Sequence, residues 1–179
     1  MERPLLRTFV AYVEDRPGVL NRVASLFRRR GYNIESLTVG RTERPGVSRM
    51  TLVLDMDDDS ARRLEANLYK LVNVLWVKDV TEGATVVRDL ALIKVKTDAS
   101  QRAAIMQLCE VFQARVVDIT PDAMIAEITS TQDKIDGLID VLRPYGIAEM
   151  VRTGAIAMAR GVQEDPLTKD ERSPSIAAA

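Results

Sequence analysis

The residues with the clearest chemical potential lie where one predicted helix begins. Asp15, Arg16, Pro17 and Gly18 form a turn, and the apolar residues that follow recur at helical spacing. The first amides of a helix have no partner within it, and together with the positive end of the helix dipole they suit a carboxylate. Gly18 also lets a ligand approach the backbone closely. The turn therefore predicts a binding site for a small carboxylate.

A second polar group, Asn33, follows the predicted end of the same helix. The three arginines at 28–30 suit a helix C-terminus, Gly31 suits a left-handed stop, and the Asn33 amide can both donate and accept hydrogen bonds. A simpler interpretation is that Pro17 and Gly18 only start a helix, Gly31 only ends it and Asn33 only caps the loop. The spacing alone leaves both interpretations open.

The composition argues against most catalytic chemistry. The 179-residue chain has no histidine, which removes the commonest general base, the usual imidazole metal ligand and every Ser/His or Cys/His nucleophile. Asp57, Asp58 and Asp59 precede a helical pattern, where aspartate is favoured, so we interpret them as a helix start rather than as a metal or acid–base cluster. The sequence predicts no catalytic residues and no metal ligands.

Charge and cysteine content limit the partners and the compartment. A formal net charge of -1 gives no general case for binding nucleic acid or an anionic membrane. The single cysteine, Cys109, lies on the apolar side of a predicted helix, which favours core packing. No apolar run is long enough to cross a bilayer, and the N-terminus lacks a signal-peptide cleavage region, so we expect a cytoplasmic protein.

The periodicity of the first half predicts the order βαββαβ. The expected elements are a strand at 8–14, a helix at 18–30, strands at 33–41 and 47–55, a helix at 58–72 and a strand at 74–80. Right-handed crossovers interleave them into a ferredoxin-like antiparallel sheet of order 4-1-3-2, with both helices on one face. Strand 33–41 is then an edge, where Ile34, Leu37 and Val39 favour pairing with the same strand of a second chain.

The pattern repeats in the second half. The expected elements are a strand at 86–96, a helix at 100–112, strands at 114–120 and 123–129, a helix at 131–142 after a capping box from Ser130 to Asp133, and strands at 147–152 and 154–160. The fold class is therefore α+β, with two ferredoxin-like units. We expect domains at 1–82 and 83–160 and a flexible tail at 161–179. The second unit lacks the Pro-Gly turn, so we expect the ligand in the first unit and dimer or partner contacts in the second.

Several runs carry a resemblance to a known family. They are EDRPGVLNRVASLFRRRGYNIESLTVGRTE at 14–43, SRMT at 48–51, LVNVLWV at 71–77, and residues 88–96 and 118–121. The sequence closely resembles the small regulatory subunits of acetolactate synthase, also called acetohydroxyacid synthase, over about residues 5–160. The resemblance implies that the first unit is an ACT domain, a sensor that commonly binds amino acids, and that the second is the C-terminal domain of these subunits.

The resemblance also implies a function without catalysis in this chain. Such a subunit activates a separate catalytic (large) subunit, which condenses pyruvate with a second 2-oxo acid in the biosynthesis of valine, leucine and isoleucine. It also confers feedback inhibition by valine. Thiamine diphosphate, FAD and Mg²⁺ are expected only in the catalytic subunit, and no cofactor is expected in this chain.

Carried over by position, the valine site of the family falls on residues of the turn and of the edge strand. They are Asp15, Gly18, Val19, Leu20, Asn33 and Ile34. The N–H groups of 18–20 would bind the carboxylate, Asn33 from a paired chain would hold the polar end, and Asp15 would attract the ammonium, although many relatives have Asn at this position. Val19 and Ile34 would form an apolar wall, and valine would bridge a homodimer joined by its ACT edge strands.

Three other functions remain as alternatives. An RNA-binding module shares the βαββαβ order, but base stacking needs aromatic residues and only 4% of the chain is aromatic. A small metabolic enzyme would need a paired nucleophile and base, which the sequence does not offer. An ACT-type sensor of another amino acid, acting on a different enzyme or regulator, fits the same residues.

Overall fold

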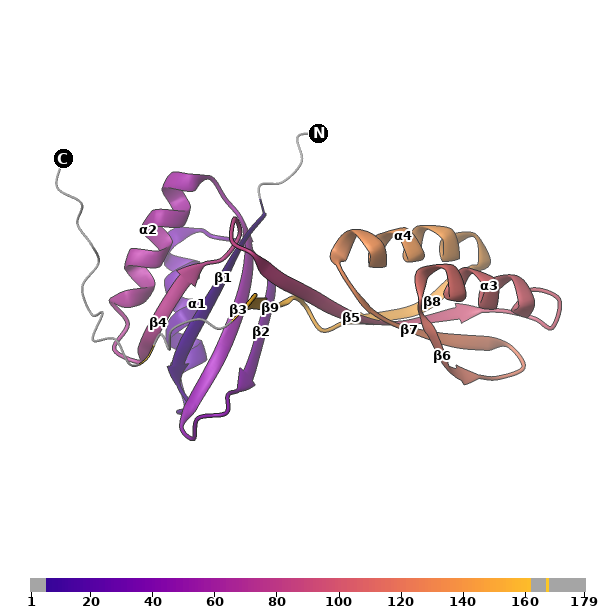
Figure 1. Cartoon of the computed structure of the whole chain (residues 1–179), viewed down its shortest axis with the longest axis horizontal. Coiled ribbons are helices and arrows are strands. Elements are labelled where there is room, and N and C mark those ends of the chain that lie inside the picture. Colours follow the sequence, from indigo (N-terminus) through magenta and orange to yellow (C-terminus); the bar gives the residue numbers. More distant parts are fainter. Residues whose placement is uncertain (1–5, 162–166, 168–179) are drawn as a thin grey trace. The chain divides into compact units, whose positions relative to one another are not determined.

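The first half of the chain forms one sheet covered by two helices. The computed structural model describes residues 6–161 and Leu167. The elements are β1 (Leu6–Glu14), α1 (Val19–Arg30), β2 (Ile34–Arg41), β3 (Val47–Asp55), α2 (Asp58–Tyr69) and β4 (Val74–Asp79). The sheet is antiparallel with the order β2-β3-β1-β4, and both helices lie on one face (Figure 1). The predicted order, topology and edge strand are confirmed.

The alternation of side-chain directions along β1 explains how one face of this sheet packs against the helices. Phe9, Ala11 and Val13 point to the helical face and are buried together with Val23 and Phe27 of α1. A fully buried valine or phenylalanine side chain stabilises the fold by about 1.5–3 kcal/mol relative to an exposed one. The same packing fixes the position of the α1 N-terminus against the end of β1.

Helix α2 begins as predicted and ends three residues earlier than predicted. Asp57 is the N-cap, and its side chain accepts a hydrogen bond from the Ser60 N–H at 2.6 Å, as expected of a helix start. The helix ends at Tyr69, and the chain then turns through a hydrogen bond from the Leu71 N–H to the Leu68 carbonyl. Val72 continues the apolar spacing but is 87% exposed, so the periodicity extends past the helix itself.

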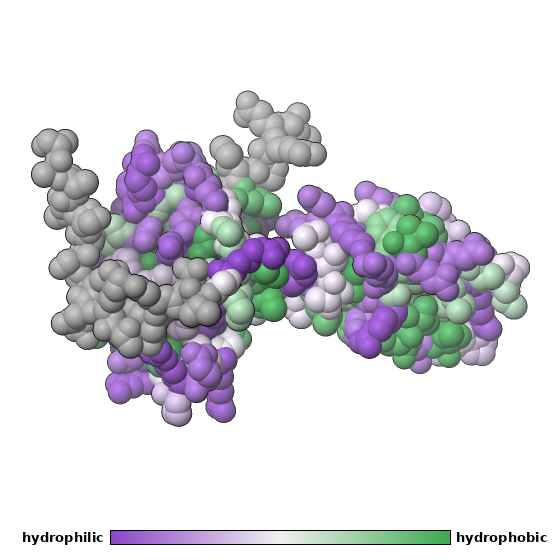
Figure 2. Space-filling model, in the orientation of Figure 1, coloured by the Kyte–Doolittle hydropathy of each residue, from purple (hydrophilic) through white to green (hydrophobic). Residues whose placement is uncertain are grey.

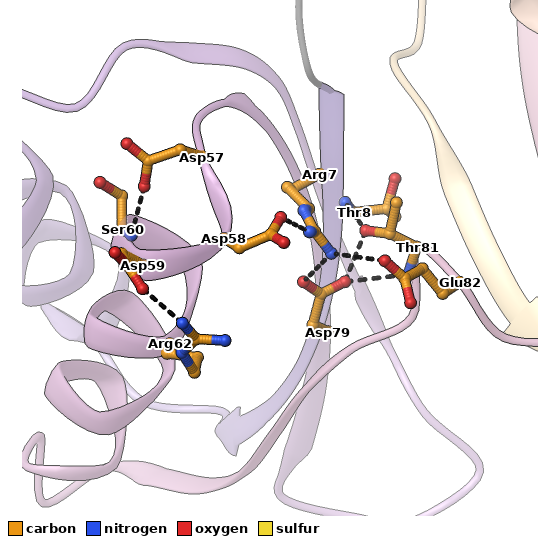
Figure 3. A network of polar contacts seen from close by, with 10 residues as sticks. All are labelled: Arg7, Thr8, Asp57, Asp58, Asp59, Ser60, Arg62, Asp79, Thr81 and Glu82. Atoms are coloured by element: carbon orange, nitrogen blue, oxygen red, sulfur yellow. Dashed lines mark hydrogen bonds and ion pairs between the residues drawn. The ribbon is translucent and has the colours of Figure 1, made fainter.

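The guanidinium group of Arg7 forms ion pairs with three surrounding carboxylates. Arg7 pairs with Asp58 at the start of α2, with Asp79 at 3.3 Å and with Glu82 at 3.6 Å (Figure 3). Carboxylates from the start of α2 and from the segment that ends β4 and follows it thus share one cation at the β1 start. Among the described residues, no group of three or more His, Cys, Asp or Glu side chains is arranged to hold a metal ion.

The second half repeats the arrangement. Its elements are β5 (Thr85–Lys96), α3 (Arg102–Phe112), β6 (Arg115–Ile119), β7 (Ala123–Ser130), α4 (Gln132–Leu142), a 3₁₀ turn η1 (Arg143–Tyr145), β8 (Ile147–Arg152) and β9 (Ile156–Ala159). The sheet order is β6-β7-β5-β8, α3 and α4 lie on one face (Figure 1), and the short β9 pairs with β5. The predicted α+β class with two ferredoxin-like units is confirmed.

Two further sequence predictions can be compared with this unit. Cys109 is buried among the core residues, and burial raises the pKa of its thiol, as expected of a packing residue. The capping box at Ser130 is wrong, because the N-cap of α4 is Thr131 and its side chain makes no capping hydrogen bond.

The chain divides into two compact units. One is Val87–Ile156, and the other contains the described residues up to Val86 together with those from Ala157 onward. The tail expected at 161–179 lies outside the described residues, except for Gly161 and Leu167. No helix in the described part of the chain is long and apolar enough to span a membrane.

Candidate functional site

The turn before α1 leaves the start of this helix open. Gly18 is the N-cap, with a φ of 85°, and it offers no side chain to the first amides. The first turn contains no acidic residue. The Val19 N–H reaches the Arg16 carbonyl only at 3.4 Å, and the first regular bond runs from the Arg22 N–H to the Gly18 carbonyl at 3.1 Å. Free amides and the helix dipole together favour an external anion here.

Gly18 is required by its backbone conformation rather than by crowding. At a φ of 85° an L side chain is strained, whereas a Cβ built at this position meets no heavy atom within 4 Å. The space above the turn is therefore open, and a ligand can reach the backbone.

The second unit has a corresponding turn before α3. Matching backbone hydrogen bonds align it with the turn before α1. At the end of the first strand, the Glu14 N–H donates to the Asn73 carbonyl at 2.9 Å, and in the second unit the Lys96 N–H donates to the Gly146 carbonyl at 2.9 Å. After the first helix, the Tyr32 N–H donates to the Phe27 carbonyl at 3.1 Å, and in the second unit the Ala114 N–H donates to the Cys109 carbonyl at 2.8 Å. In both pairs of matching bonds the donors are 82 residues apart. Positions 16 and 18 of the first unit therefore correspond to positions 98 and 100 of the second.

In the second unit, a carboxylate of the chain itself already binds the turn before α3, whose N-cap is Gln101. Asp98 accepts hydrogen bonds from the Ser100 hydroxyl at 2.6 Å and from the N–H groups of Ser100 and Gln101 at 2.8 and 3.1 Å. These bonds lower the pKa of Asp98 below the ordinary aspartate value. The corresponding residue in the first unit is Arg16, which is 72% exposed and cannot fill the site. Among the described residues, no carboxylate of the chain accepts from the corresponding amides at Gly18 and Val19.

The predicted site residues of the turn differ in what their side chains do. Asp15 is held by its N–H, which donates to the Gly46 carbonyl at 2.8 Å, and its carboxylate lies 3.6 Å from Arg41 Nε. Val19 is only 4% exposed and belongs to the core, so at this site it offers its backbone N–H. Leu20 is 45% exposed and supplies the apolar surface of the turn.

Asn33 and Ile34 lie at the opposite end of the sheet from this turn within one chain. The exposed Asn33 donates to Glu35 at 2.5 Å, and the half-buried Ile34 packs against the core beside α1. Register shows the separation: Ile34 pairs with Leu54, which lies at the β3 end that faces the start of β1. One chain alone does not bring the six predicted residues together.

Two residues near the turn were missed by the sequence interpretation. Arg41 approaches Asp15 because β2 and β1 both flank β3, and Asn73 contacts Glu14 and Arg22 from the turn before β4. No motif marks either residue. Arg41 could have been found by placing the predicted strand ends side by side, since strand order alone sets the end of β2 near the end of β1.

The fold and the site define a class: two ferredoxin-like units, of which the first is an ACT-type unit with an open helix start. Comparison with known families agrees. Residues 9–76 match a model described as an AHAS small subunit-like ACT domain, and residues 88–161 match the small subunit of acetolactate synthase. The chain belongs to the acetolactate synthase small-subunit family.

Individual relatives support the same assignment. The chain is 48% identical to the probable acetolactate synthase small subunit of Archaeoglobus fulgidus, over 86% of this chain and 96% of the relative. It is 45% identical to the Bacillus subtilis small subunit, over 88% and 92%. The crystal structure of the Thermotoga maritima small subunit matches with a TM-score of 0.81 and 37% identity, over 88% of this chain and 99% of that one. Membership supports a regulatory role in this enzyme.

Proposed function

We propose that this chain activates the catalytic subunit of acetolactate synthase and makes it sensitive to inhibition by valine. The observation that supports this proposal most directly is the open start of α1, set against the second unit, where Asp98 accepts hydrogen bonds from the corresponding amides at Ser100 and Gln101. A free amino acid brings the carboxylate that the first unit lacks. Thiamine diphosphate, FAD and Mg²⁺ belong to the catalytic subunit in this proposal.

A homodimer completes the valine site. Strand β2 is the edge of its sheet, and two-fold antiparallel pairing about the middle of Ile34–Arg41 would set Ile34 of the partner subunit beside Arg41. Arg41 in turn lies 3.6 Å from Asp15. Pairing of the edge strands therefore brings together the two halves of the site that one chain keeps at opposite ends of its sheet.

Each group of the amino acid then has a counterpart. The carboxylate binds the N–H groups at Gly18, Val19 and Leu20, and Asn33 of the partner subunit binds the polar end. The ammonium competes with Arg41 for Asp15, which loses its present ion pair when valine binds. Leu20 and Ile34 of the partner subunit form the apolar wall, where one methylene typically discriminates by about 1–3 kcal/mol.

Inhibition follows from linkage. Valine that bridges two first units stabilises one arrangement of the dimer. If a different dimer arrangement activates the catalytic subunit, valine lowers the population of that active arrangement, to an extent set by the difference between its affinities for the two arrangements. Contacts with the catalytic subunit are expected on the second unit. Its β6 carries the exposed Val117 and Ile119, and Figure 2 shows hydrophobic surface over this strand.

An acetolactate-forming assay tests the proposal. The cognate catalytic subunit is measured alone and with this protein, each with and without valine. We expect activation by this protein and its reversal by valine. No activation would contradict the regulatory proposal, and activation without a valine response would point to a different effector, which a binding screen of amino acids on the full chain would identify.

A further inference from the structure

Three side chains brace the turn that carries the open helix start. Asn73 donates from Nδ2 to Glu14 Oε2 at 2.6 Å, and its Oδ1 accepts from Arg22 Nη1 at 2.6 Å. The Asn73 carbonyl also accepts the Glu14 N–H at 2.9 Å. Glu14 is the last residue of β1, and the Arg22 N–H bonds to the Gly18 carbonyl at 3.1 Å. The turn is thus held at both of its ends by one residue.

We infer that Asn73 is a positioning residue for the effector site, a role that rests on the proposed function. Asn73 fixes the end of β1 and the second turn of α1 to a common point, and so holds the amides between them in the geometry that binds a carboxylate. An unbraced turn would have to be ordered when the ligand binds, and that ordering costs affinity. Asn73 acts through the turn and does not touch the amino acid.

The brace also controls a charge. Glu14 places a carboxylate next to a site that receives another carboxylate, and the two would repel each other. The Asn73 amide donates to Glu14, and Arg16 Nε lies 3.6 Å from the same oxygen. These groups hold the Glu14 carboxylate to one side of the turn, so that its charge has a fixed place relative to the first amides of α1.

The second unit supports this inference by contrast. The residue that corresponds to Asn73 is Gly146, whose carbonyl accepts the Lys96 N–H at 2.9 Å. Gly146 has no side chain, so the backbone contact is kept and the brace is absent. The unit without the brace is also the unit in which Asp98 binds the amides of the turn before α3. The brace therefore occurs in the unit whose corresponding amides receive no carboxylate of the chain.

Asn73→Ala in the assembled enzyme tests the inference. We expect the valine concentration for half-inhibition to rise about three- to tenfold, the cost of a typical hydrogen bond, with activation in the absence of valine unchanged. Asn67→Ala is the matched control. Asn67 donates to the Arg63 carbonyl at 2.6 Å and accepts from Arg30 at 3.2 Å, at the far end of α1. Its loss should lower stability and leave the valine response unchanged.

A polarity swap separates positioning from simple packing. Asn73→Asp keeps the size of the side chain but faces the Glu14 carboxylate with a second one, so the valine response should weaken. Adding Glu14→Gln restores one donor and one acceptor with the same total charge, and the response should return to within about twofold of wild type. A normal valine response in Asn73→Asp, or in Asn73→Ala, would overturn the inference.

A readout without valine keeps this inference separable from the proposed function. Amide hydrogen exchange at Asp15 and Arg22 reports the turn directly, since the Asp15 N–H ties the turn to the Gly46 carbonyl and the Arg22 N–H donates to the Gly18 carbonyl. We expect faster exchange at these two amides in Asn73→Ala than in Asn67→Ala. Unchanged exchange would overturn the inference, whereas a wild-type enzyme that ignores valine would contradict only the proposed function.

Discussion

One residue type at one position distinguishes the two helix starts. Asp98 binds the amides of Ser100 and Gln101 in the turn before α3, while Arg16 stands at the corresponding place in the first unit. A carboxylate at this position competes directly with an external one, because both bind the same first amides. In the proposed function, binding of an external carboxylate to the first unit therefore depends on the absence of an acid at position 16.

Arg16→Asp should close the effector site. The new carboxylate would bind the amides at Gly18 and Val19, as Asp98 does at Ser100 and Gln101. We expect the valine concentration for half-inhibition to rise at least tenfold, since charge-assisted bonds are worth about 1.5–3 kcal/mol, while thermal stability is kept. Arg88→Asp makes the same charge change at an exposed position of β5 and should leave the valine response intact. A normal valine response in Arg16→Asp would show that valine does not use these amides.

Asn33→Ala tests the contribution of the edge strand. Its amide donates to Glu35 in the free chain, and in the proposed dimer it would bind the amino acid instead. We expect weaker valine inhibition with folding and activation unchanged. Glu35→Ala removes the same internal contact without removing the ligand group, and serves as the control. Equal valine sensitivity in Asn33→Ala and wild type would remove Asn33 from the site.

At the level of single residues, the sequence predicted roles that depend on local chemistry. Gly18 and Asp57 lie as expected, because a turn and an N-cap are set by neighbours in the chain. Val19 could not be assigned from its type alone, since a valine at helical spacing suits both a ligand wall and the core, and the structure places it in the core. Arg41 and Asn73 reach the turn only through tertiary contacts, which no local pattern encodes.

Among the helices and strands, the order, the topology and the ends of α1, α3 and α4 were predicted, whereas α2 ends at Tyr69 and not at the predicted Val72. Period-two and helical patterns fixed which elements form, and the handedness of crossovers fixed their order in the sheet. The lack of a glycine at the end of α3 did not prevent a left-handed stop, because Gln113 adopts a φ of 58° there, where Gly31 has 69° in α1. Tertiary packing overrides the preference of a single residue at these ends.

Two hydrogen-bonded carboxylates, Asp57 at the N-cap of α2 and Asp98 in the turn before α3, should make stability depend on pH. Hydrogen bonds from Ser60 lower the pKa of Asp57, and those from Ser100 lower the pKa of Asp98. Both groups therefore stabilise the fold above their unfolded pKa of about 3.9, and this contribution is lost as the pH falls through the folded values. Thermal unfolding measured from pH 6 to pH 2 should show a shallower decline in Asp98→Asn than in wild type. Parallel curves would contradict this origin of the pH dependence.

Strand β2 should control assembly. Val39 lies on this edge strand and is 43% exposed, and a lysine on an edge strand discourages pairing with another strand. We expect Val39→Lys to shift the chain toward monomer in light-scattering measurements and to weaken the valine response together with it. Val111→Lys makes the same change at an exposed position of α3 and should do neither. A Val39→Lys chain that remains dimeric would exclude β2 pairing as the dimer contact.

At the scale of the whole molecule, one scaffold is used twice with different outcomes. Both units have four antiparallel strands in the same order and two helices. In both, a backbone hydrogen bond joins the end of the first strand to the residue before the fourth strand. The first unit adds the Asn73 brace and an open helix start, and the second adds an internal carboxylate. The duplicated fold thus permits the proposed division, in which the first unit binds the effector and the second does not.

Because the proposed valine site contains residues of two chains, binding and dimerisation must be linked. Valine should lower the dissociation constant of the dimer, and dilution to monomer should weaken valine binding by the same factor. Sedimentation velocity over a range of protein concentrations, with and without valine, measures the first effect, and calorimetric titration at two protein concentrations measures the second. Val39→Lys should reduce both effects and Asn33→Ala should reduce valine binding without changing the dimer in its absence. Valine binding that is equally tight to monomer and dimer would show that one chain holds the whole site, contrary to the separation of Asn33 from the Gly18 turn in the fold.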